Sequence, residues 1–579
     1  GVTGCRRDFA NSRYVLNFAA DPYIKGEDML SGLQDLLAGR LDNGARLVTV
    51  AARLNNTAGR SDSWIPVSAA DYGTFARALS YHLIAAGLYN KNALAEHGLQ
   101  VAELKVLLKK FAPEKVASQI GVEAGKIREI AVAMSRYQPA LAIYDDELLL
   151  APDGRQSAAA VELLNMLLGA IGQPGGVYYY KDDGLGALAT SFESQKNQPR
   201  VSMDWFANWL AVGGNRTAVI NYAANPAYTT FSGKYPYALW QNTYKIPFHL
   251  AIDTHFSETT FFADLILPAA TELETFALND ALLADGRRVL SLRQPVSRLV
   301  DEIFLLRQAK AKKLDLFSQK REPVAESRDF NQIVLELQQL LSGNSPESAP
   351  RVSSWLEDMI GRAPFVRAGI DWHRLQKDGF QTYRHSSTSI KLKPEVMATS
   401  FAPLQKRPDI EHANAFTLIP YRWHTLDNQT ANCKYLAEFR HDNSIWIHPD
   451  KAAHLGIVEG ADVQVKSQVG SVTIKAWLTE AIHPDCVAVS LGLGHTKLGR
   501  VAQAKKIAQK DPMTRALLMH NPVHFTPFSF RLRAWDPVEP VWWHEKGNGV
   551  DIRRIFKATV DAKHAGMTEI DTTVRLQKV

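Results

Sequence analysis

The stretch DTHFSETTFFADLILPAATELE, residues 253–274, joins a polar loop to a short helix, an apolar strand and a polar turn. Residues 248–252, just before it, are a short apolar run suited to a strand that is covered on both faces. Ser257 and Glu258 are typical of a helix start, and residues 263–267 are apolar again before a proline. The pattern predicts strand, short helix and strand in succession, and no side chain in it predicts catalysis by itself.

Length and composition limit the class of protein. A chain of 579 residues is far above the size of a single core, so about two to four domains are expected. The net charge of +6 is small for this length, and no basic block is interleaved with aromatic residues, which argues against nucleic acid as a partner. No apolar run reaches the roughly 18 residues of a membrane-spanning helix, so this chain is not expected to span a membrane by itself.

The three cysteines are Cys5, Cys433 and Cys486, and they form no CxxC pair. The chain therefore lacks the ligands of a four-cysteine iron–sulfur cluster, and three dispersed cysteines do not indicate a disulfide scaffold. They are compatible with either the cytoplasm or the periplasm. Cys433 and Cys486 are expected in the core.

The ordered string in residues 253–274 resembles the hallmark of the molybdopterin oxidoreductases of the dimethyl-sulfoxide-reductase family. Its pattern is Asp-x-x-x-(Ser/Thr)-Glu-Thr, followed by Ala-Asp-(Leu/Val)-(Ile/Val)-Leu-Pro-Ala-Ala-Thr-x-Leu-Glu. The resemblance implies an α/β, multidomain fold with two doubly wound αβ halves and a C-terminal β-barrel of the six-stranded type. It also implies that molybdopterin guanine dinucleotide, with molybdenum or tungsten, is a possible cofactor, with Asp253 near a guanine.

The resemblance covers nearly the whole chain and divides it into four parts. Residues 1–150 are expected to form the first nucleotide-type αβ half, and residues 151–302 the second. Residues 303–415 predict helices and an exposed linker without chemistry. From residue 416 to 579 short alternating strands and turns predict the barrel, which in the family caps the cofactor.

In the first half, residues 13–53 predict a βαβ unit, whose loops at the carboxyl edge are where nucleotides usually bind. Family members usually have Gly-x-Asn-Pro where this chain has Ala19-Ala20-Asp21-Pro22, so an alanine methyl and an aspartate charge would lie near phosphates. After the second strand they tend to have Asp-Pro-Arg, with the carboxylate reading guanine. Here Ala51-Ala52-Arg53 lacks that carboxylate, and ordinary drift in loop residues is the alternative explanation.

A second copy of the strand and loop occurs at residues 218–226, where Asn225 and Pro226 are kept and Ala223 again replaces the glycine. The two copies suggest two related halves, each able to face one nucleotide. The run Asp145-Asp146-Glu147 stands where active members often have glycine and histidine close to the metal. Three carboxylates would repel an anionic cofactor in a dry site, unless they face solvent or a partner.

Two barrel loops resemble, more narrowly, the molybdopterin-like subunits of the membrane-bound menaquinone reductase (Qrc-type) complex and of alternative complex III. The loops are Tyr421–Thr425 with its continuation to Asn432, and Gly492–Arg500. By analogy with the family, the candidate cofactor-binding residues of the whole chain are Asp21, Pro22, Arg53, Asn225, Pro226, Asp253, His424, Thr425, Asn432, His495 and Thr496. His448 is expected to be a turn residue, because no second ligand has metal-site spacing to it.

Three hypotheses follow. The first is an electron-conducting subunit with a degenerate or empty cofactor site, on the periplasmic side of the cytoplasmic membrane. Its partners would be a ferredoxin-like iron–sulfur subunit, a multihaem cytochrome c subunit and a quinone-binding membrane subunit. The second is a working molybdenum or tungsten bis-pterin enzyme that acts on polysulfide, thiosulfate or arsenic compounds. The third is a binding scaffold without redox partners, which ranks last because its only support is analogy of fold.

The start of the chain, Gly1-Val2-Thr3-Gly4-Cys5, is neither a start methionine nor a signal peptide. Family members reach the matching first strand only after a leader, an often cluster-binding domain and the segment with the metal ligand. We therefore expect that an N-terminal part is missing, and that an iron–sulfur cluster lies only there or in a partner. Cys5 is expected to be a small loop residue rather than the metal thiolate.

Overall fold

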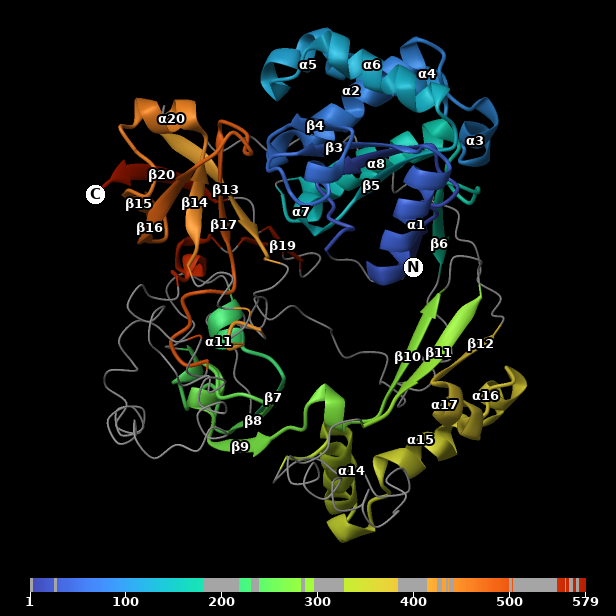
Figure 1. Ribbon diagram of the computed structural model, residues 1–579, viewed down its shortest axis with the longest axis vertical. Coiled ribbons are helices and arrows are strands. Elements are labelled where there is room, and N and C mark those ends of the chain that lie inside the picture. Colours follow the sequence, from blue (N-terminus) through green and yellow to red (C-terminus); the bar gives the residue numbers. More distant parts are fainter. Residues whose placement is uncertain are drawn as a thin grey trace, which may run out of the picture.

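The computed structural model describes residues 4–24, 29–151, 153–180, 218–230, 239–282, 287–295, 327–383, 414–423, 430–433, 436, 442–498, 502, 549–557, 559–561, 566–568 and 572–579. They form two αβ halves, a helical unit with a small antiparallel sheet, and a barrel (Figure 1). The barrel lies beside the first half and above strands β7 to β9 of the second half, so it contacts both halves.

The first half is built on a four-stranded parallel sheet in the order β4-β3-β2-β5, which confirms the predicted βαβ unit. The strands are β2 Tyr14–Phe18, β3 Arg46–Ala51, β4 Ser63–Pro66 and β5 Ala140–Tyr144. Nearly every residue of β2, β3 and β5 is buried, as expected for a sheet that helices cover on both faces. The loops that follow Phe18, Ala51 and Tyr144 therefore meet at one edge of the sheet.

Helices surround this sheet: α1 Met29–Asp42, α2 Tyr72–Ala85, α3 Lys91–Glu96, α4 Val101–Leu108, α5 Pro113–Ile120, α6 Ala124–Arg136, α7 Asp146–Leu149 and α8 Gly154–Leu168. Helix α2 is buried on nearly all sides, because α8 covers one side and α4 to α6 cover the other. Gly121, with φ +75°, ends α5 in the left-handed conformation that glycine favours.

The second half repeats the same frame with three parallel strands: β7 Val219–Tyr222, β8 His249–Asp253 and β9 Leu265–Pro268. A 3-10 turn, Thr260–Phe262, stands before β9, as the turn Ala58–Arg60 stands before β4. The amide of His249 donates to the Asp264 carboxylate at 2.7 Å, and the amide of Leu47 donates to the Asp62 carboxylate at 2.7 Å. The segments 51–66 and 253–268 are therefore structural copies, aligned residue for residue without a gap.

The third unit is the antiparallel sheet β10-β11-β12 with four helices packed against one core. Its strands are β10 Ala277–Leu282, β11 Arg288–Arg293 and β12 Phe380–Tyr383, and its helices are α14 Phe330–Leu341, α15 Val352–Ile360, α16 Ala363–Arg367 and α17 Trp372–Asp378. A buried ion pair of Arg288 with Asp280, at 3.0 Å, joins the first two strands. Within residues 303–415, which predict helices and an exposed linker, residues 343–350 form an exposed connection between α14 and α15.

The C-terminal part is a closed barrel of six strands in the order β13-β17-β14-β16-β15-β20, which confirms the prediction. The strands are β13 Ala415–Tyr421, β14 Ser444–Ile447, β15 Asp462–Lys466, β16 Ser471–Leu478, β17 Cys486–Ser490 and β20 Thr573–Lys578. Inward-facing aliphatic residues of all six strands fill it. His448 caps α20, Pro449–His454, in the turn after β14, as expected.

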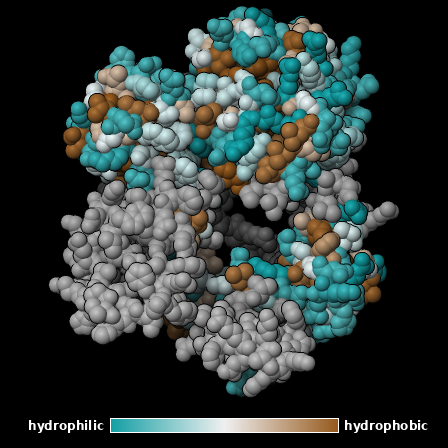
Figure 2. Space-filling view, viewed as in Figure 1, coloured by the Kyte–Doolittle hydropathy of each residue, from teal (hydrophilic) through white to brown (hydrophobic). Residues whose placement is uncertain are grey.

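Two further sheets have two antiparallel strands each. They pair β1 Gly4–Arg7 with β6 Val177–Tyr180, and β18 Thr559–Asp561 with β19 Gly566–Thr568. The short helix α11, Pro226–Thr229, follows β7. On the face shown in Figure 2 the coloured part of the barrel and of the first half is mostly polar, with small separate apolar patches. Among the described helices, none is long and apolar enough to cross a membrane.

Candidate functional site

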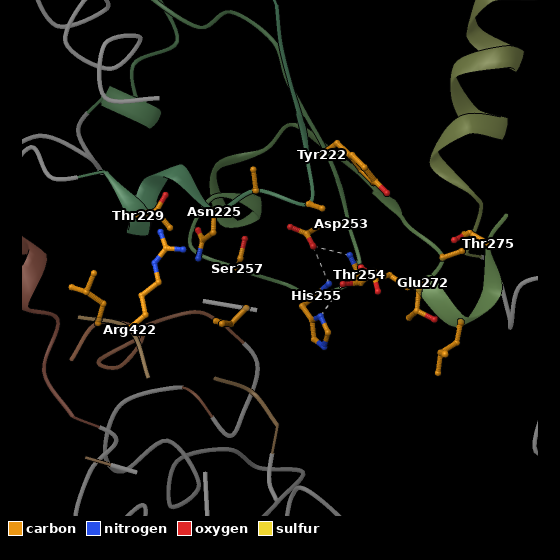
Figure 3. Close-up of a pocket in the computed structure, with 18 of the residues that line it drawn as sticks. Tyr222, Asn225, Thr229, Asp253, Thr254, His255, Ser257, Glu272, Thr275 and Arg422 are labelled. Atoms are coloured by element: carbon orange, nitrogen blue, oxygen red, sulfur yellow. Dashed lines mark hydrogen bonds between the residues drawn. The ribbon is translucent and has the colours of Figure 1, made fainter. Parts of the chain in front are cut away.

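A pocket of about 840 Å³ lies at the carboxyl edge of the second sheet, where the loops after β7, β8 and β9 face the barrel. Asp253 stands near its centre, and Arg422 extends from the barrel side toward Asn225 and Thr229 (Figure 3). The lining residues come from these three loops, from the end of β11 and from the barrel part of the chain: Tyr222, Ala223, Ala224, Asn225, Thr229, Asp253, Thr254, His255, Ser257, Ala270, Thr271, Glu272, Leu273, Thr275, Arg293, Arg422, Leu491, Gly492, Leu498 and Arg553.

The charges of this pocket suit a ligand that is anionic at one end and has hydrogen-bond donors at the other. Three guanidinium groups line it, those of Arg293, Arg422 and Arg553. Guanidinium groups are charged at all ordinary pH values and bind phosphate in a bidentate manner. Burial raises the pKa of the Asp253 carboxyl, although the amides of Thr254 and His255 donate to it and partly offset that effect.

Asn225 is fixed from both ends of its amide. Its Oδ1 accepts hydrogen bonds from the Thr259 amide at 3.1 Å and the Thr259 hydroxyl at 2.9 Å, and its Nδ2 donates to the Glu258 carboxylate at 2.7 Å. Pro226 is buried at the start of α11. The loop after β7 therefore takes its shape from the Ser-Glu-Thr segment of the neighbouring strand loop, and this places Asn225 at the pocket wall.

Glu258 joins the second half to the barrel. Its Oε1 accepts from the backbone amides of Thr496 at 2.6 Å and Lys497 at 3.0 Å, and lies 3.2 Å from Nδ1 of His495. The side chains of Glu258 and His495 are fully buried. Burial by itself raises the pKa of the Glu258 carboxyl, but the hydrogen bond and charge of His495 and the donors from Asn225 and Lys497 outweigh it, and the pKa falls to about 2.

Two aromatic contacts extend this junction. The ring of Tyr228, in α11, stacks on His495 with centroids 3.6 Å apart, and the guanidinium of Arg553 lies 4.4 Å from its centroid. The Tyr228 hydroxyl donates to the carbonyl of Leu493 at 2.6 Å. These contacts hold the barrel loop 493–497 over the second half, beside the pocket.

The loop after β2 in the first half has the same backbone as the loop after β7. The amide of Ala19 donates to Val50 at 2.9 Å, and the amide of Ala223 donates to Ile252 at 3.0 Å. Both alanines have positive φ, 57° and 46°, which is the left-handed region that favours the glycine of the family pattern. Each loop therefore has an alanine at a position where the left-handed backbone conformation favours glycine.

Asp21 matches Asn225 in its partners as well as in its position. Its Oδ1 accepts from the Thr57 amide at 3.0 Å and the Thr57 hydroxyl at 2.6 Å, as Asn225 Oδ1 does from Thr259. Asp21 is buried, so its charge faces Thr57 and not an open cavity. Pro22 is half-buried in the turn that follows.

The loop after β3 is packed against the barrel. The Arg53 guanidinium lies 4.1 Å from the Tyr421 ring centroid and 5.4 Å from that of Trp446. The Leu54 amide donates to Ala481, and the His483 amide donates to Ala52. Ala52 also donates its own amide to the hydroxyl of the buried Tyr72, so the backbone of this loop already has protein partners.

The acidic run is neither free nor clustered around a cavity. Asp145 caps α7, and Glu147 accepts a hydrogen bond from Tyr72 at 2.9 Å. Burial raises the pKa of Tyr72, which keeps the phenol protonated as the donor. Asp146 is exposed. The alternative expectation, that the run faces solvent or a partner, holds for Asp146 alone, because Asp145 and Glu147 are half-buried.

The cysteines differ in their surroundings. Cys486 is buried between the barrel and the first half, as predicted, and burial raises the pKa of its thiol to about 12. The prediction that Cys433 is a core residue is wrong, because it lies exposed in a short loop. Cys5 is exposed in β1 and not in a loop. In the described part of the chain, no group of three or more His, Cys, Asp or Glu side chains is placed to hold a metal ion.

Of the candidate residues, Asn225 and Asp253 line the pocket, and Pro226, His495 and Thr496 lie directly behind it. Asn432 accepts from the amide of Ala502, which packs with the pocket residue Leu498. Asp21, Pro22 and Arg53 lie on the other half, where Asp21 binds Thr57 and Arg53 packs on the barrel residues Tyr421 and Trp446. His424 and Thr425 lie outside the described residues. That these residues bind a cofactor stays a prediction.

Sequence reasoning missed Glu258, Tyr228 and Arg553 as functional candidates. Glu258 stood inside the quoted motif, but its partners lie in the barrel, far along the chain, and no local pattern reveals them. The match of residues 51–66 to 253–268 was available as a signal, since Thr57, Asp62 and Pro66 recur in the same spacing as Thr259, Asp264 and Pro268.

Comparison with known proteins gives two family matches. Residues 4–300 match the family model described as "Molybdopterin oxidoreductase", and residues 417–516 match "Molydopterin dinucleotide binding domain". The arsenate respiratory reductase molybdopterin-containing subunit ArrA of Chrysiogenes arsenatis is 24% identical over 86% of this chain and 71% of its own length. The menaquinone reductase molybdopterin-binding-like subunit of Nitratidesulfovibrio vulgaris is 24% identical over 80% of this chain and 61% of its own length.

A further relative is similar over most of the chain, and a solved structure shares its fold. The thiosulfate reductase molybdopterin-containing subunit PhsA of Salmonella typhimurium is 23% identical over 84% of this chain and 69% of its own length. Acetylene hydratase from Pelobacter acetylenicus matches in structure with a TM-score of 0.69 over the whole chain and 79% of its own, at 14% identity. At that identity the likeness shows the fold alone.

Proposed function

Because the chain belongs to the molybdopterin oxidoreductase family, we propose that it is a molybdopterin-like subunit of a membrane-associated respiratory quinone oxidoreductase complex. In this role it supports electron transfer between iron–sulfur and haem partners and menaquinone, and its cofactor site is degenerate. Its partners are a ferredoxin-like iron–sulfur subunit, a multihaem cytochrome c subunit and a quinone-binding membrane subunit. The complex lies on the periplasmic side of the cytoplasmic membrane, and this chain is attached to it through those partners.

One observation carries the proposal. The edge of the first half that would face one pterin dinucleotide is occupied by protein: Asp21 binds Thr57, and Arg53 packs on barrel aromatic rings. A bis-pterin cofactor needs both halves, so the residues present do not fit it. The similarity to a menaquinone reductase molybdopterin-binding-like subunit is consistent with this reading.

The second half fits one such group better. Asp253 and Asn225 would hold its base end, Arg422 and Arg553 would hold its phosphates, and Pro226, His495 and Thr496 would keep the surrounding loops in place. We extend this proposed set to Asn432, and to His424 and Thr425. When bound, a molybdenum or tungsten pterin group supplies redox chemistry, and the protein supplies position and electrostatics.

The alternative function is a working molybdenum or tungsten oxidoreductase for polysulfide, thiosulfate or arsenic compounds. The observation in its favour is the similarity to the ArrA and PhsA subunits over most of this chain. It requires the first half to open, and it requires a metal ligand from outside the described residues.

The test is to purify the complex through a tag on this chain and identify the proteins that accompany it. Quinone turnover is then measured together with molybdenum and tungsten by plasma mass spectrometry, and pterin by the fluorescence of its oxidised form. The proposal expects the three partner types and quinone turnover without stoichiometric metal. Stoichiometric metal with two pterins per chain, and turnover of arsenate or thiosulfate, would establish the alternative instead.

A further inference from the structure

The two αβ halves present equivalent loops to the barrel, but only one of these loop pairs borders the pocket. Ala19 and Ala20 are buried, with 3% and 1% of their surface exposed, whereas the matching Ala223 and Ala224 are exposed. Ala51 and Ala52 are buried, whereas the matching Asp253 is half-buried in the pocket wall and Thr254 is exposed. We infer that this chain holds one guanine nucleotide, in the second half, and none in the first.

The chemistry of the second half selects the ligand class. A guanine base presents two adjacent donors, N1–H and the 2-amino group, and a carboxylate presents two acceptor oxygens that match them. Adenine presents one donor and one acceptor along the same edge, so it matches a carboxylate less well. Asp253 supplies the carboxylate, Arg422 supplies bidentate donors for a diphosphate, and the buried Arg553 adds positive charge to the wall of the same pocket.

Three features of the first half exclude a second nucleotide. The residue that matches Asp253 is Ala51, which has no acceptor side chain and is fully buried. The amide and carbonyl of Ala52 are taken by Tyr72 and His483. Arg53 matches His255 in position, and its guanidinium packs against the rings of Tyr421 and Trp446, at 4.1 and 5.4 Å from their centroids.

The asymmetry originates in how the barrel docks. Against the first half it makes backbone hydrogen bonds directly to the loop at the sheet edge, through Ala481 and His483. Against the second half it binds Glu258, which lies behind the loop, so the edge itself stays open. The pocket of about 840 Å³ is therefore bordered by the loops of the second half, while the matching loops 19–20 and 51–52 of the first half are buried.

This inference concerns the same site as the proposed function and rests on it, but it makes a separate claim about stoichiometry. The test measures total guanine-nucleotide capacity of the purified complex. Guanine released by acid extraction is quantified per chain, and GDP is titrated into a second portion by calorimetry, with ADP as the comparison. We expect extracted guanine and titratable GDP to add to one per chain, and GDP to bind at least 10-fold more tightly than ADP.

Two variants locate the site. Asp253→Asn keeps an acceptor for the Thr254 amide but offers guanine one acceptor and one donor in place of two acceptors. We therefore expect the capacity to fall below one tenth of a guanine nucleotide per chain, or the affinity for GDP to fall at least 10-fold. Arg422→Gln is expected to weaken GDP binding as well, because it removes a contact to the phosphates.

Two further variants are controls. Asp21→Asn gives the first half the asparagine that the second half has at the matching position 225, and it is expected to leave the capacity at one. Asp462→Asn, on the exposed barrel surface, removes an equal charge and is the matched control.

Each result decides something. A capacity of two, or a capacity of zero in the folded wild-type complex, overturns the inference, and so does GDP binding that neither pocket variant weakens. A capacity of zero with intact quinone turnover leaves the proposed function standing. A capacity of one in a complex that turns over arsenate or thiosulfate, and not quinone, removes the proposed function and leaves the nucleotide site.

Discussion

The two αβ halves share one backbone frame and differ in what reaches their carboxyl edges. Thr57 and Thr259 donate to the matching Asp21 and Asn225 in the same way, so this pair of hydrogen bonds belongs to the frame. The difference lies in the remaining amide nitrogen, since Asn225 can donate to Glu258 and an aspartate cannot. The two halves therefore have the same backbone arrangement, although the carboxyl edge of the sheet is covered by protein in the first half and open to the pocket in the second.

The strongest test of this comparison is Glu258→Gln, which removes the charge that holds the barrel to the second half. The new amide would place a donor against the donating groups of Asn225, Thr496 and Lys497. We expect the free energy of unfolding to fall by about 3 kcal/mol, the usual cost of breaking a buried charge pair. The measurement is urea unfolding with limited proteolysis of the barrel loop.

The matched control is Glu272→Gln, whose carboxylate is exposed and lies 3.8 Å from Arg293. It should change stability by less than about 0.5 kcal/mol. Equal effects of the two substitutions would show that the barrel does not depend on Glu258.

The same carboxylate predicts how stability depends on pH. A pKa lowered from 4.5 to about 2 means that the unfolded chain binds the proton first as pH falls, so Glu258 stabilises the fold fully above pH 4.5. This contribution, about 3 kcal/mol, is lost as pH falls from about 4.5 to 2. Urea unfolding at several pH values should show the loss in the wild type and a smaller slope in Glu258→Gln. Parallel curves for the two proteins would contradict the assignment.

A smaller effect on the free energy of unfolding is expected at the contact between the first half and the barrel. Arg53→Met removes the cation from the Tyr421 and Trp446 rings and should cost about 1–2 kcal/mol. Hydrogen exchange should quicken at the amides of Leu54 and His483, which cross between the first half and the barrel. Arg60→Met, at an exposed arginine over Tyr23, is the control and should leave both amides protected. Unchanged exchange in Arg53→Met would show that the backbone contacts alone close this edge.

The smallest effect compares the two strained alanines. Ala223→Gly relieves positive φ at an exposed position and should raise the free energy of unfolding by up to about 1 kcal/mol. Ala19→Gly relieves the same strain but removes a buried methyl group worth about 0.8 kcal/mol, so little net change is expected. Thermal unfolding of both variants checks this, and a larger gain at Ala19 would show that its methyl does not pack.

Much of the frame could be predicted from local patterns. The motif at 253–274, the βαβ unit and the barrel strands each depend on short runs of apolar residues and turn residues, and all of them appear where expected. Asp253 and Asn225 were found because they belong to that motif and to the repeated loop. Asp21 was expected to place charge near phosphates, and the structure shows that its carboxylate instead repeats the bond of Asn225 to a threonine.

What could not be predicted depends on contacts between distant parts of the chain. The burial of α2 on all sides, the docking of Arg53 on Tyr421 and the junction at Glu258 each require knowing which surfaces meet. Sequence periodicity reports which face of an element is apolar, and it carries no information on which partner covers that face. The barrel closes the edge of the first half, and this contact could therefore not be predicted from the sequence.

Asn225 links the pocket to the barrel, so that ligand binding and barrel docking are thermodynamically coupled. Its amide lines the pocket and is also bonded to the carboxylate that holds residues 495–497. A ligand that binds only when the barrel is docked must strengthen docking by the same factor by which docking strengthens the ligand. At a ligand concentration 100 times Kd this amounts to about 2.7 kcal/mol. The position of the barrel would then report, to any subunit that touches it, whether the pocket is filled.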